Sequence, residues 1–212
     1  MPKQNRLKFT DPAPDQEMLS ASGEPLRLST LWSQGTLLLA FTRHFGCPQC
    51  KELLDELGLY RPNLSQAGIT TAVVTQAAPD ETSAFCAEFA PGLTCLADPK
   101  RKAYAAYGLG RGSLRQTLLS LRVFRANARV QARKGWTPQL PPRGQDALLM
   151  SGIFIIGSDG RVRLPYYYDN IADHPSLDLL LHGVLGVDWN RPFDGRIAAD
   201  EPDPASKDED RS

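Results

Sequence analysis

The sequence predicts an α/β fold in which a central mixed sheet is flanked by helices, with one inserted basic helix. Two apolar runs, at 36–41 and 68–76, have the length and composition of strands buried on both faces. Segments with helical spacing of apolar residues alternate with these strands, which is typical of a parallel core sheet. Later in the chain, a strand, an Asp159–Gly160 turn and a returning strand add an antiparallel hairpin.

The N-terminal half of the chain alternates between strand and helix patterns. Residues 1–18 are polar, and we expect them to form an extended lead-in. The segment 23–32 predicts a short strand followed by a turn. The buried strand 36–41 precedes a helix that begins near Pro48, where the missing proline N–H costs nothing. The leucines that recur at helical spacing in this helix are Leu53, Leu54 and Leu57.

Shorter elements follow the second buried strand. The segment 79–90 predicts a helix with Asp80 as its N-cap and with Phe85 and Phe89 facing inward. The remaining predicted elements are a short strand over 93–99, a helix over 101–108, the hairpin, and an amphipathic helix over 174–186. This order, with a C-x-x-C at the start of the helix that follows a central strand, is that of a thioredoxin-like fold. We expect a single domain over 1–199 and an acidic, disordered tail over 200–212.

A basic segment is inserted before the hairpin, at about 111–143. From Arg111 through Arg143 the chain has eight basic residues and no acidic ones. Within it, 113–134 has helical periodicity, with an apolar side and an arginine stripe. The apolar set is Leu114, Leu118, Leu121 and Phe124, and the stripe is Arg115, Arg122, Arg129 and Arg133. The helix either packs on the domain with its arginines in water or docks a second subunit, an acidic partner or an anionic substrate.

Composition argues against several classes of protein. The 212 residues carry 24 basic and 24 acidic side chains, so the molecule as a whole has no bulk attraction for nucleic acid. The chain opens without a secretory signal, and no run approaches the roughly 18 apolar residues of a membrane span. We therefore expect a cytoplasmic protein without a nucleic-acid partner, a membrane span, a cofactor or a metal.

The motif C-P-Q-C lies where the first buried strand gives way to a helix. A thiolate at a helix N-terminus meets unpaired N–H groups and the positive end of the helix dipole, which lower its pKa from about 8.5 to roughly 3.5–7.5. The spacing lets Cys50 reach Cys47 and form a disulfide. Arg43 and His44, just upstream, supply positive charge that favours the thiolate. We predict that Cys47 is the attacking thiol and Cys50 the resolving thiol.

Metal binding and ordinary packing are the alternative uses of these cysteines. A structural zinc site takes four ligands, commonly from two paired clusters, whereas this chain has one C-x-x-C. Cys86 and Cys95 stand alone in predicted core elements, where we expect small buried apolar side chains rather than redox participants. Redox use is favoured, because the C-x-x-C follows a buried strand in a thioredoxin-like order of elements.

Several stretches carry a family resemblance: "LRLSTLWSQGTLLLAFTRHFGCPQCKELLDEL", "LADPKRKAYAAYGLG" and "GIFIIGSDGRVR". Together they resemble the alkyl hydroperoxide reductase/thiol-specific antioxidant family of the thioredoxin superfamily, in the peroxiredoxin-like branch that carries C-x-x-C. The resemblance implies a thioredoxin-like fold and thiol-based reduction of peroxides or disulfides. It also implies an antioxidant role and an external thiol reductant that resets the enzyme.

Two positions depart from the family pattern. Typical peroxiredoxins place a threonine three residues before the attacking cysteine and an arginine before the "GxFII" strand. The matching positions here are His44 and Ser151. Because peroxide cleavage needs donors arranged around the developing oxygen charge, these replacements weaken the expectation of efficient peroxidase activity. Thioredoxins proper carry a cis-proline before this strand, whereas Ser151 and Gly152 form a small loop that a partner backbone can approach.

Three functions are therefore compared. The favoured one is a peroxiredoxin-like thiol oxidoreductase in which Cys47 attacks a peroxide and Cys50 closes an intramolecular disulfide. The first alternative is an oxidoreductase that acts on protein disulfides and has little peroxidase activity. The second is a non-enzymatic thioredoxin-fold module that docks a partner through the helix 113–134.

Overall fold

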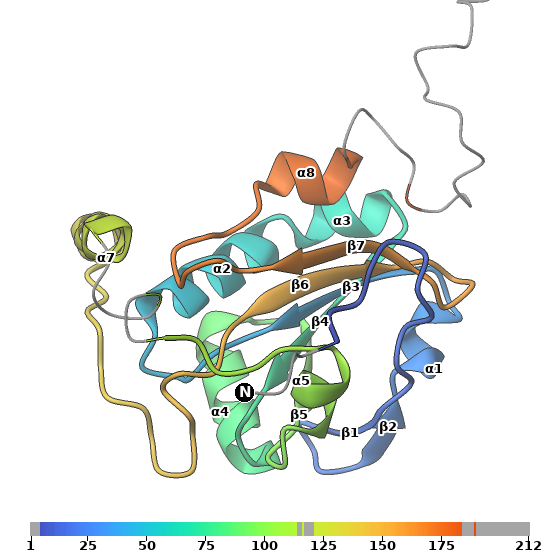
Figure 1. Cartoon of the computed structure of the whole chain (residues 1–212), viewed down its shortest axis with the longest axis horizontal. Helices are drawn as coiled ribbons and strands as arrows, with labels where there is room; N and C mark the ends of the chain where they lie inside the picture. The colour runs from blue at the N-terminus through green and yellow to red at the C-terminus, as the bar shows by residue number, and fades with distance from the viewer. Residues whose placement is uncertain (1–4, 114–115, 117–120, 184–188, 190–212) are drawn as a thin grey trace, which may run out of the picture.

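The computed structural model describes residues 5–113, 116, 121–183 and 189, and a seven-stranded mixed sheet forms its centre (Figure 1). The strands are β1 (Glu17–Ser20), β2 (Pro25–Arg27), β3 (Thr36–Phe41), β4 (Ile69–Thr75), β5 (Thr94–Ala97), β6 (Gly152–Ile156) and β7 (Val162–Tyr167). The helices are α1 (Ser29–Trp32), α2 (Pro48–Leu59), α3 (Arg61–Gln66), α4 (Pro79–Phe89), α5 (Lys102–Ala106), α7 (Leu121–Lys134) and α8 (Leu177–His182). The predicted fold class is confirmed.

The sheet combines a parallel centre with antiparallel edges, in the order β2-β1-β5-β4-β3-β6-β7. Strands β3, β4 and β5 are parallel, and the predicted hairpin β6–β7 pairs antiparallel with β3. On β3, Phe41 lies opposite Val74 of β4 and Gly152 of β6. This register brings the end of β3, and the turn that follows it, beside the start of β6.

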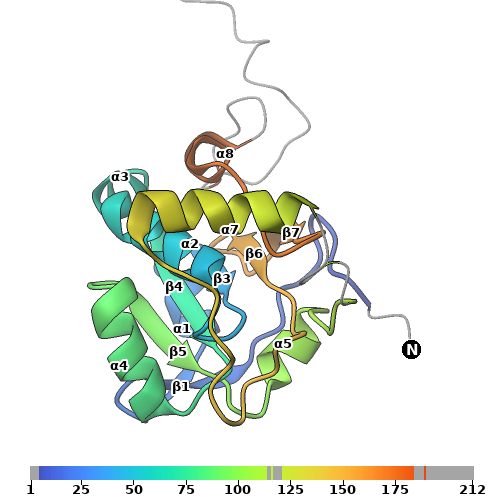
Figure 2. The same cartoon turned by 90° about the vertical axis from the view of Figure 1, so that its left-hand side faces the viewer.

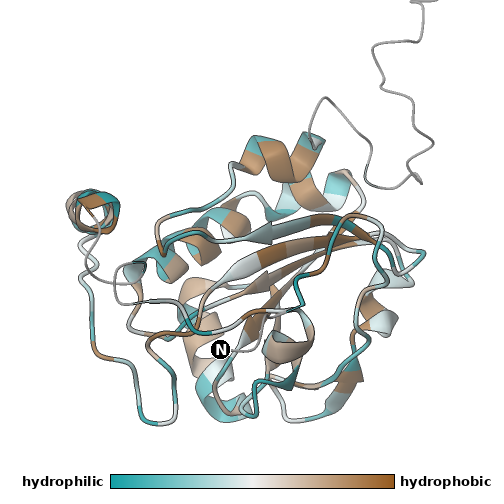
Figure 3. Cartoon of the chain, in the orientation of Figure 1, coloured by the Kyte–Doolittle hydropathy of each residue, from teal (hydrophilic) through white to brown (hydrophobic). Residues whose placement is uncertain are grey.

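Strand β3 is buried along its whole length because strands flank both of its edges and helices cover both faces of the sheet. Its side chains alternate between two apolar clusters. Leu37, Leu39 and Phe41 pack on the side of α1 and α5, and Leu38 and Ala40 pack on the side of α2, α3 and α8. Figure 3 shows apolar residues along the central strands and many hydrophilic ones in the loops.

Some local predictions are corrected by the structure. Strand β1 falls partly within the segment expected to be an extended lead-in, and α3 was not predicted. The N-cap of α4 is Ala78 rather than Asp80, because Pro79 occupies the first helical position and starts the helix one residue earlier. Asp80 lies in the first turn, where its charge complements the helix dipole.

Helix α7 is the inserted basic helix, and Figure 2 shows it lying across the molecule in front of α2. Its buried side chains are Val123, Ala126 and Val130. Leu121 and Phe124, on the predicted apolar side, do not pack on the domain, since these side chains are 63% and 70% exposed. The helix therefore docks through a different stripe from the one that its largest apolar residues suggested.

Ion pairs explain this orientation of α7. Arg133 lies 3.3 Å and Arg129 3.7 Å from the carboxylate of Glu52 on α2, and Lys134 lies 2.7 Å from Asp55. Two arginines of the predicted stripe thus hold the helix on its own domain. Glu52 is buried, but both arginines are more than half exposed, so each pair contributes modestly. The pairs select which stripe of α7 faces α2, and burial of that stripe provides most of the attachment.

Other predictions fall on residues outside the described part of the chain. These are the helical start before Leu121, with Leu114, Leu118 and Arg115, and the acidic segment 200–212. Among the residues that the structure describes, no helix has the length and apolar character needed to cross a membrane.

Cys86 and Cys95 form a disulfide, so the prediction of two separate apolar thiols is wrong. Cys86 lies on the inward side of α4, and Cys95 lies on β5 at a Cα–Cα distance of 6.6 Å. The chain reverses direction between the two elements, which brings residues nine apart in sequence together in the third apolar cluster. The cysteine spacing alone does not reveal this reversal.

Replacing both Cys86 and Cys95 with alanine is expected to lower the free energy of unfolding by about 2–3 kcal/mol, because the disulfide restricts the unfolded chain over a short loop. Urea unfolding of the oxidised wild type and of the double variant measures this difference. A reductant should destabilise the wild type more than the variant, which has no such bond to lose. Equal urea midpoints for the two oxidised proteins would contradict the prediction.

Candidate redox site

Cys47 and Cys50 occupy the start of α2, as the sequence predicts. Cys47 is the N-cap residue, with an extended backbone, and Pro48 occupies the first turn of the helix. The Cys47 N–H donates to the His44 carbonyl at 3.0 Å, which closes the turn between β3 and α2. Both thiols are free and buried, with exposed fractions of 1% and 3%.

Arg43 is a buried cation beside the cysteines. Its Nη1 lies 3.6 Å from the Cys47 sulfur, its Nε donates to the Leu149 carbonyl at 3.0 Å, and its Nη2 donates to the Ala147 carbonyl. In the described part of the chain, no carboxylate forms an ion pair with Arg43. A buried charge needs a counter-charge, and the Cys47 thiolate is positioned to provide it.

The two thiols have opposite tendencies to ionise. A hydrogen bond from the Cys50 thiol lowers the pKa of Cys47, burial raises it, and the charge of Arg43 lowers it further, to about 6. The pKa of Cys50 is raised well above its ordinary value, because it donates that hydrogen bond and is buried. At neutral pH, Cys47 is therefore the thiolate and Cys50 the thiol.

His44 does not provide the positive charge expected of it. Burial and the neighbouring charge of Arg43 lower the pKa of His44 to about 4, so the ring is neutral at pH 7. Its Nδ1 is buried and has no hydrogen-bond partner among the described residues. The positive charge next to the thiols comes from Arg43.

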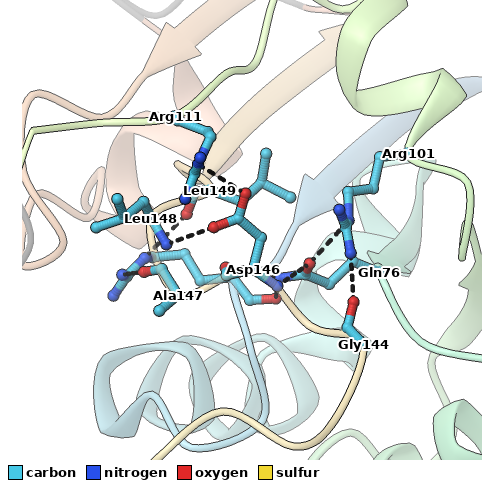
Figure 4. Close-up of polar contacts among 9 residues, drawn as sticks. Gln76, Arg101, Arg111, Gly144, Asp146, Ala147, Leu148 and Leu149 are labelled. Carbon is cyan, nitrogen blue, oxygen red and sulfur yellow. Dashed lines mark hydrogen bonds and ion pairs between the residues drawn. The ribbon is translucent and has the colours of Figure 1, made fainter.

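Gln76, directly after β4, fixes the backbone around Arg43. Figure 4 shows its contacts with Asp146 and Arg101. Its Nε2 donates to the carbonyls of Arg43 and Asp146 at 3.0 and 3.1 Å. Its Oε1 accepts from the Asp146 N–H at 2.7 Å and from Arg101 Nε at 3.1 Å. The Asp146 carboxylate in turn pairs with Arg111 at 3.0 Å. Sequence analysis missed Gln76, although a polar residue directly after a buried parallel strand was a usable signal.

The segment that follows α7 packs against the cysteine turn. The Gln139 N–H donates to the Gly46 carbonyl at 2.9 Å, and the Phe45 N–H donates to Gln145 Oε1 at 2.9 Å. The approach is close, because a Cβ atom on Gly46 would overlap the Gln139 carbonyl oxygen. The insertion thereby helps to bury the thiols, and position 46 requires glycine for steric reasons.

Ser151 and Gly152 lie at the start of β6, beside the end of β3. Both are buried, and a Cβ atom on Gly152 would lie 2.8 Å from Leu109. In the described part of the chain, the Ser151 hydroxyl forms no hydrogen bond with Cys47 or Cys50, and no peptide bond is cis. The structure thus brings Arg43, Pro48 and the two cysteines together and leaves Ser151 in a backbone role, accepting from the Tyr168 N–H at 3.4 Å.

Known proteins resemble this chain in sequence and in fold. The chain is 26% identical to peroxiredoxin-like 2C of Bos taurus over 184 residues, which cover 82% of this chain and 80% of that protein. The crystal structure of peroxidoxin BcpB from Mycobacterium tuberculosis superimposes with a TM-score of 0.58 and 17% identity over 79% of this chain and 90% of that one. A peroxiredoxin-like protein from Aquifex aeolicus gives a TM-score of 0.58 and 16% identity over 84% and 86% of the two chains.

The two structural matches establish the fold, and the sequence match is broader than the cysteine motif. The AhpC/TSA family pattern matches residues 9–164, a range that spans the turn after β3, the insertion, β6 and the first half of β7. With a buried thiol pair at the start of α2 and a thioredoxin-like sheet around it, the chain belongs to the AhpC/TSA family.

Proposed function

We propose that this protein is a thiol-dependent peroxidase in which Cys47 attacks the peroxide and Cys50 resolves the product. The Cys47 thiolate attacks one peroxide oxygen, an S–O bond forms, the O–O bond breaks, and the leaving oxygen takes a proton to become water or an alcohol. The Cys50 thiol, as its thiolate, then attacks the Cys47 sulfenic acid, and water leaves as the disulfide forms. An external thiol reductant supplies the two electrons that restore both thiols.

The contact between Arg43 and Cys47 is the observation that carries this proposal. A guanidinium 3.6 Å from the sulfur, held by the carbonyls of Ala147 and Leu149, stabilises the thiolate in a site from which water is excluded. In this proposal the same guanidinium also stabilises the negative charge that develops on the departing oxygen. Arg43 thus supplies the positive charge that typical members take from an arginine at the position of Ser151.

Peroxide and protein disulfides are the two oxidants to be distinguished. Reduced wild-type protein is mixed with equimolar hydrogen peroxide or cumene hydroperoxide, quenched by alkylation at intervals, and analysed by peptide mass spectrometry. The Cys47–Cys50 disulfide should form within seconds, whereas the rate of insulin disulfide reduction should remain low. Slow oxidation by both peroxides, together with rapid insulin reduction, would replace the peroxidase with a disulfide oxidoreductase.

A further inference from the structure

Gln49, within the C-P-Q-C motif, links the attacking cysteine to the inserted helix. Its side chain is fully buried, with an exposed fraction of 0%. The Cys47 thiol donates to Gln49 Oε1 at 3.5 Å, and Gln49 Nε2 donates to Asn127 Oδ1 on α7. Asn127 lies between the buried Ala126 and Val130 on the side of α7 that faces α2. A single side chain thus joins the insertion to the reacting sulfur.

This hydrogen-bond direction suits the thiol and not the thiolate. A thiolate has no proton to donate, and the amide oxygen would present a partial negative charge to it. An amide side chain carries a donor at one terminal atom and an acceptor at the other, and so does its partner Asn127. If both amides turn over, Asn127 Nδ2 donates to Gln49 Oε1 and Gln49 Nε2 donates to the Cys47 sulfur. The Gln49–Asn127 hydrogen bond is kept, and the contact with Cys47 changes from acceptor to donor.

We propose that Gln49 is a catalytic residue that donates a hydrogen bond to the Cys47 thiolate, and that Asn127 is the positioning residue that turns Gln49 into this orientation. When Cys47 loses its proton, the side-chain amides of Gln49 and Asn127 turn over together, so that each presents its other terminal atom. The helix α7, attached to α2 by its buried stripe and by ion pairs to Glu52 and Asp55, supplies Asn127 at a fixed place. The inference rests on the proposed function only in assigning Cys47 as the attacking thiol.

The first test is the pH dependence of Cys47 alkylation in the reduced full-length protein. Iodoacetamide modification of Cys47 is followed by peptide mass spectrometry, so that Cys50 does not contribute. Gln49→Leu preserves volume and removes the donor, and we expect the apparent pKa of Cys47 to rise by about one unit, since hydrogen bonds to charged groups are among the stronger ones. A lower or unchanged pKa would overturn the proposal, because an amide oxygen that stayed toward the sulfur would disfavour the thiolate.

Two comparisons separate this effect from a general disturbance of the fold. Gln131→Leu makes the same change on the exposed side of α7 and should leave the pKa of Cys47 unchanged. The urea midpoint of each variant is measured alongside. If Gln131→Leu shifted the pKa as much as Gln49→Leu, the effect would not belong to Gln49 and the proposal would fail.

Asn127 is tested through its dependence on Gln49. Asn127→Leu should raise the pKa of Cys47 in the wild-type background and have no further effect when Gln49 is already leucine. The carboxylate in Asn127→Asp can only accept a hydrogen bond, so Gln49 Nε2 must donate to it and Gln49 Oε1 must face Cys47. This variant should raise the pKa of Cys47 at least as much as Gln49→Leu does. Additive shifts in the double variant would overturn the role of Asn127. None of these measurements uses a peroxide or a protein disulfide, so their failure is distinguishable from failure of the proposed function.

Discussion

Serine in place of Cys47 is expected to abolish peroxide reduction, whereas serine in place of Cys50 should preserve the first oxidation step. The hydroxyl of Cys47→Ser cannot ionise near neutral pH, and so it supplies no nucleophile to attack the O–O bond. In Cys50→Ser the Arg43 contact with Cys47 remains, but no thiol is available to displace water from the sulfenic acid. Cys47 should therefore accumulate as the sulfenic acid, detected by dimedone labelling and intact mass.

The second cysteine pair provides the control. Cys86 on α4 and Cys95 on β5 are bonded to each other and are not part of the Cys47–Cys50 pair. Replacing both with alanine should therefore leave the rate of Cys47 oxidation unchanged. Loss of the Cys47–Cys50 disulfide in that variant would mean that electrons pass through the second pair. Peroxide turnover by Cys47→Ser would contradict the assignment of the attacking thiol itself.

The core of the fold was predictable because its signals are local. An unbroken apolar run such as 36–41 is suited only to burial on both faces, and proline one residue after Cys47 marks the start of a helix. Together these place the cysteine at the N-terminus of α2, where the helix dipole and Arg43 act on it. The position of Cys47 at the start of α2 therefore follows from sequence patterns within about twenty residues.

The orientation of α7 was not predictable from periodicity. Two stripes satisfy helical spacing, one with Leu121 and Phe124 and one with Val123, Ala126 and Val130. The larger side chains favour the first stripe on hydrophobicity alone. The second is buried because it faces α2, where Glu52 and Asp55 pair with the end of the helix. That choice depends on a neighbouring element seventy or more residues away in sequence.

The hydrogen-bond partners around the two thiols were likewise not predictable from the sequence. Gln76 and Gln49 act through hydrogen bonds with residues of the insertion and the segment after it, and a sequence does not show which distant backbone groups they meet. Comparison with the family pattern directed attention to Ser151, where typical members have an arginine. In this chain the guanidinium comes from Arg43, on the turn before Cys47, and reaches the sulfur because the carbonyls of Ala147 and Leu149 hold it there.

Replacement of Arg43 is expected to change strongly the pH dependence of Cys47 reactivity. In the wild type the pKa of Cys47 is lowered to about 6, so alkylation and peroxide oxidation should rise with pH, reach half their maximum near pH 6 and level off above pH 7. Arg43→Met removes the counter-charge while keeping most of the side-chain volume. If the pKa rises by about two units, the thiolate fraction at pH 7 falls from about nine-tenths to about one-tenth.

Damage to the fold has to be measured separately from the shift in pKa. Arg43→Met also leaves the Ala147 and Leu149 carbonyls without their donor, which costs about 1–3 kcal/mol of stability for each buried group left unpaired. An unfolded chain would expose Cys47 and give it the pKa of an ordinary thiol, about 8.5, so the urea midpoint of the variant must first show that it is folded under the assay conditions. In the folded variant, a raised pKa lowers the rate at pH 7 and restores it near pH 9. Arg43→Met should therefore recover most of the wild-type alkylation rate at high pH. Arg43→Lys keeps the charge but has one donor atom, so its Cys47 pKa should lie between those of the wild type and Arg43→Met. A pH profile of Arg43→Met that still reaches half its maximum near pH 6 would show that the thiolate is stabilised without this cation, and the helix N-terminus and Cys50 would then have to account for the whole shift.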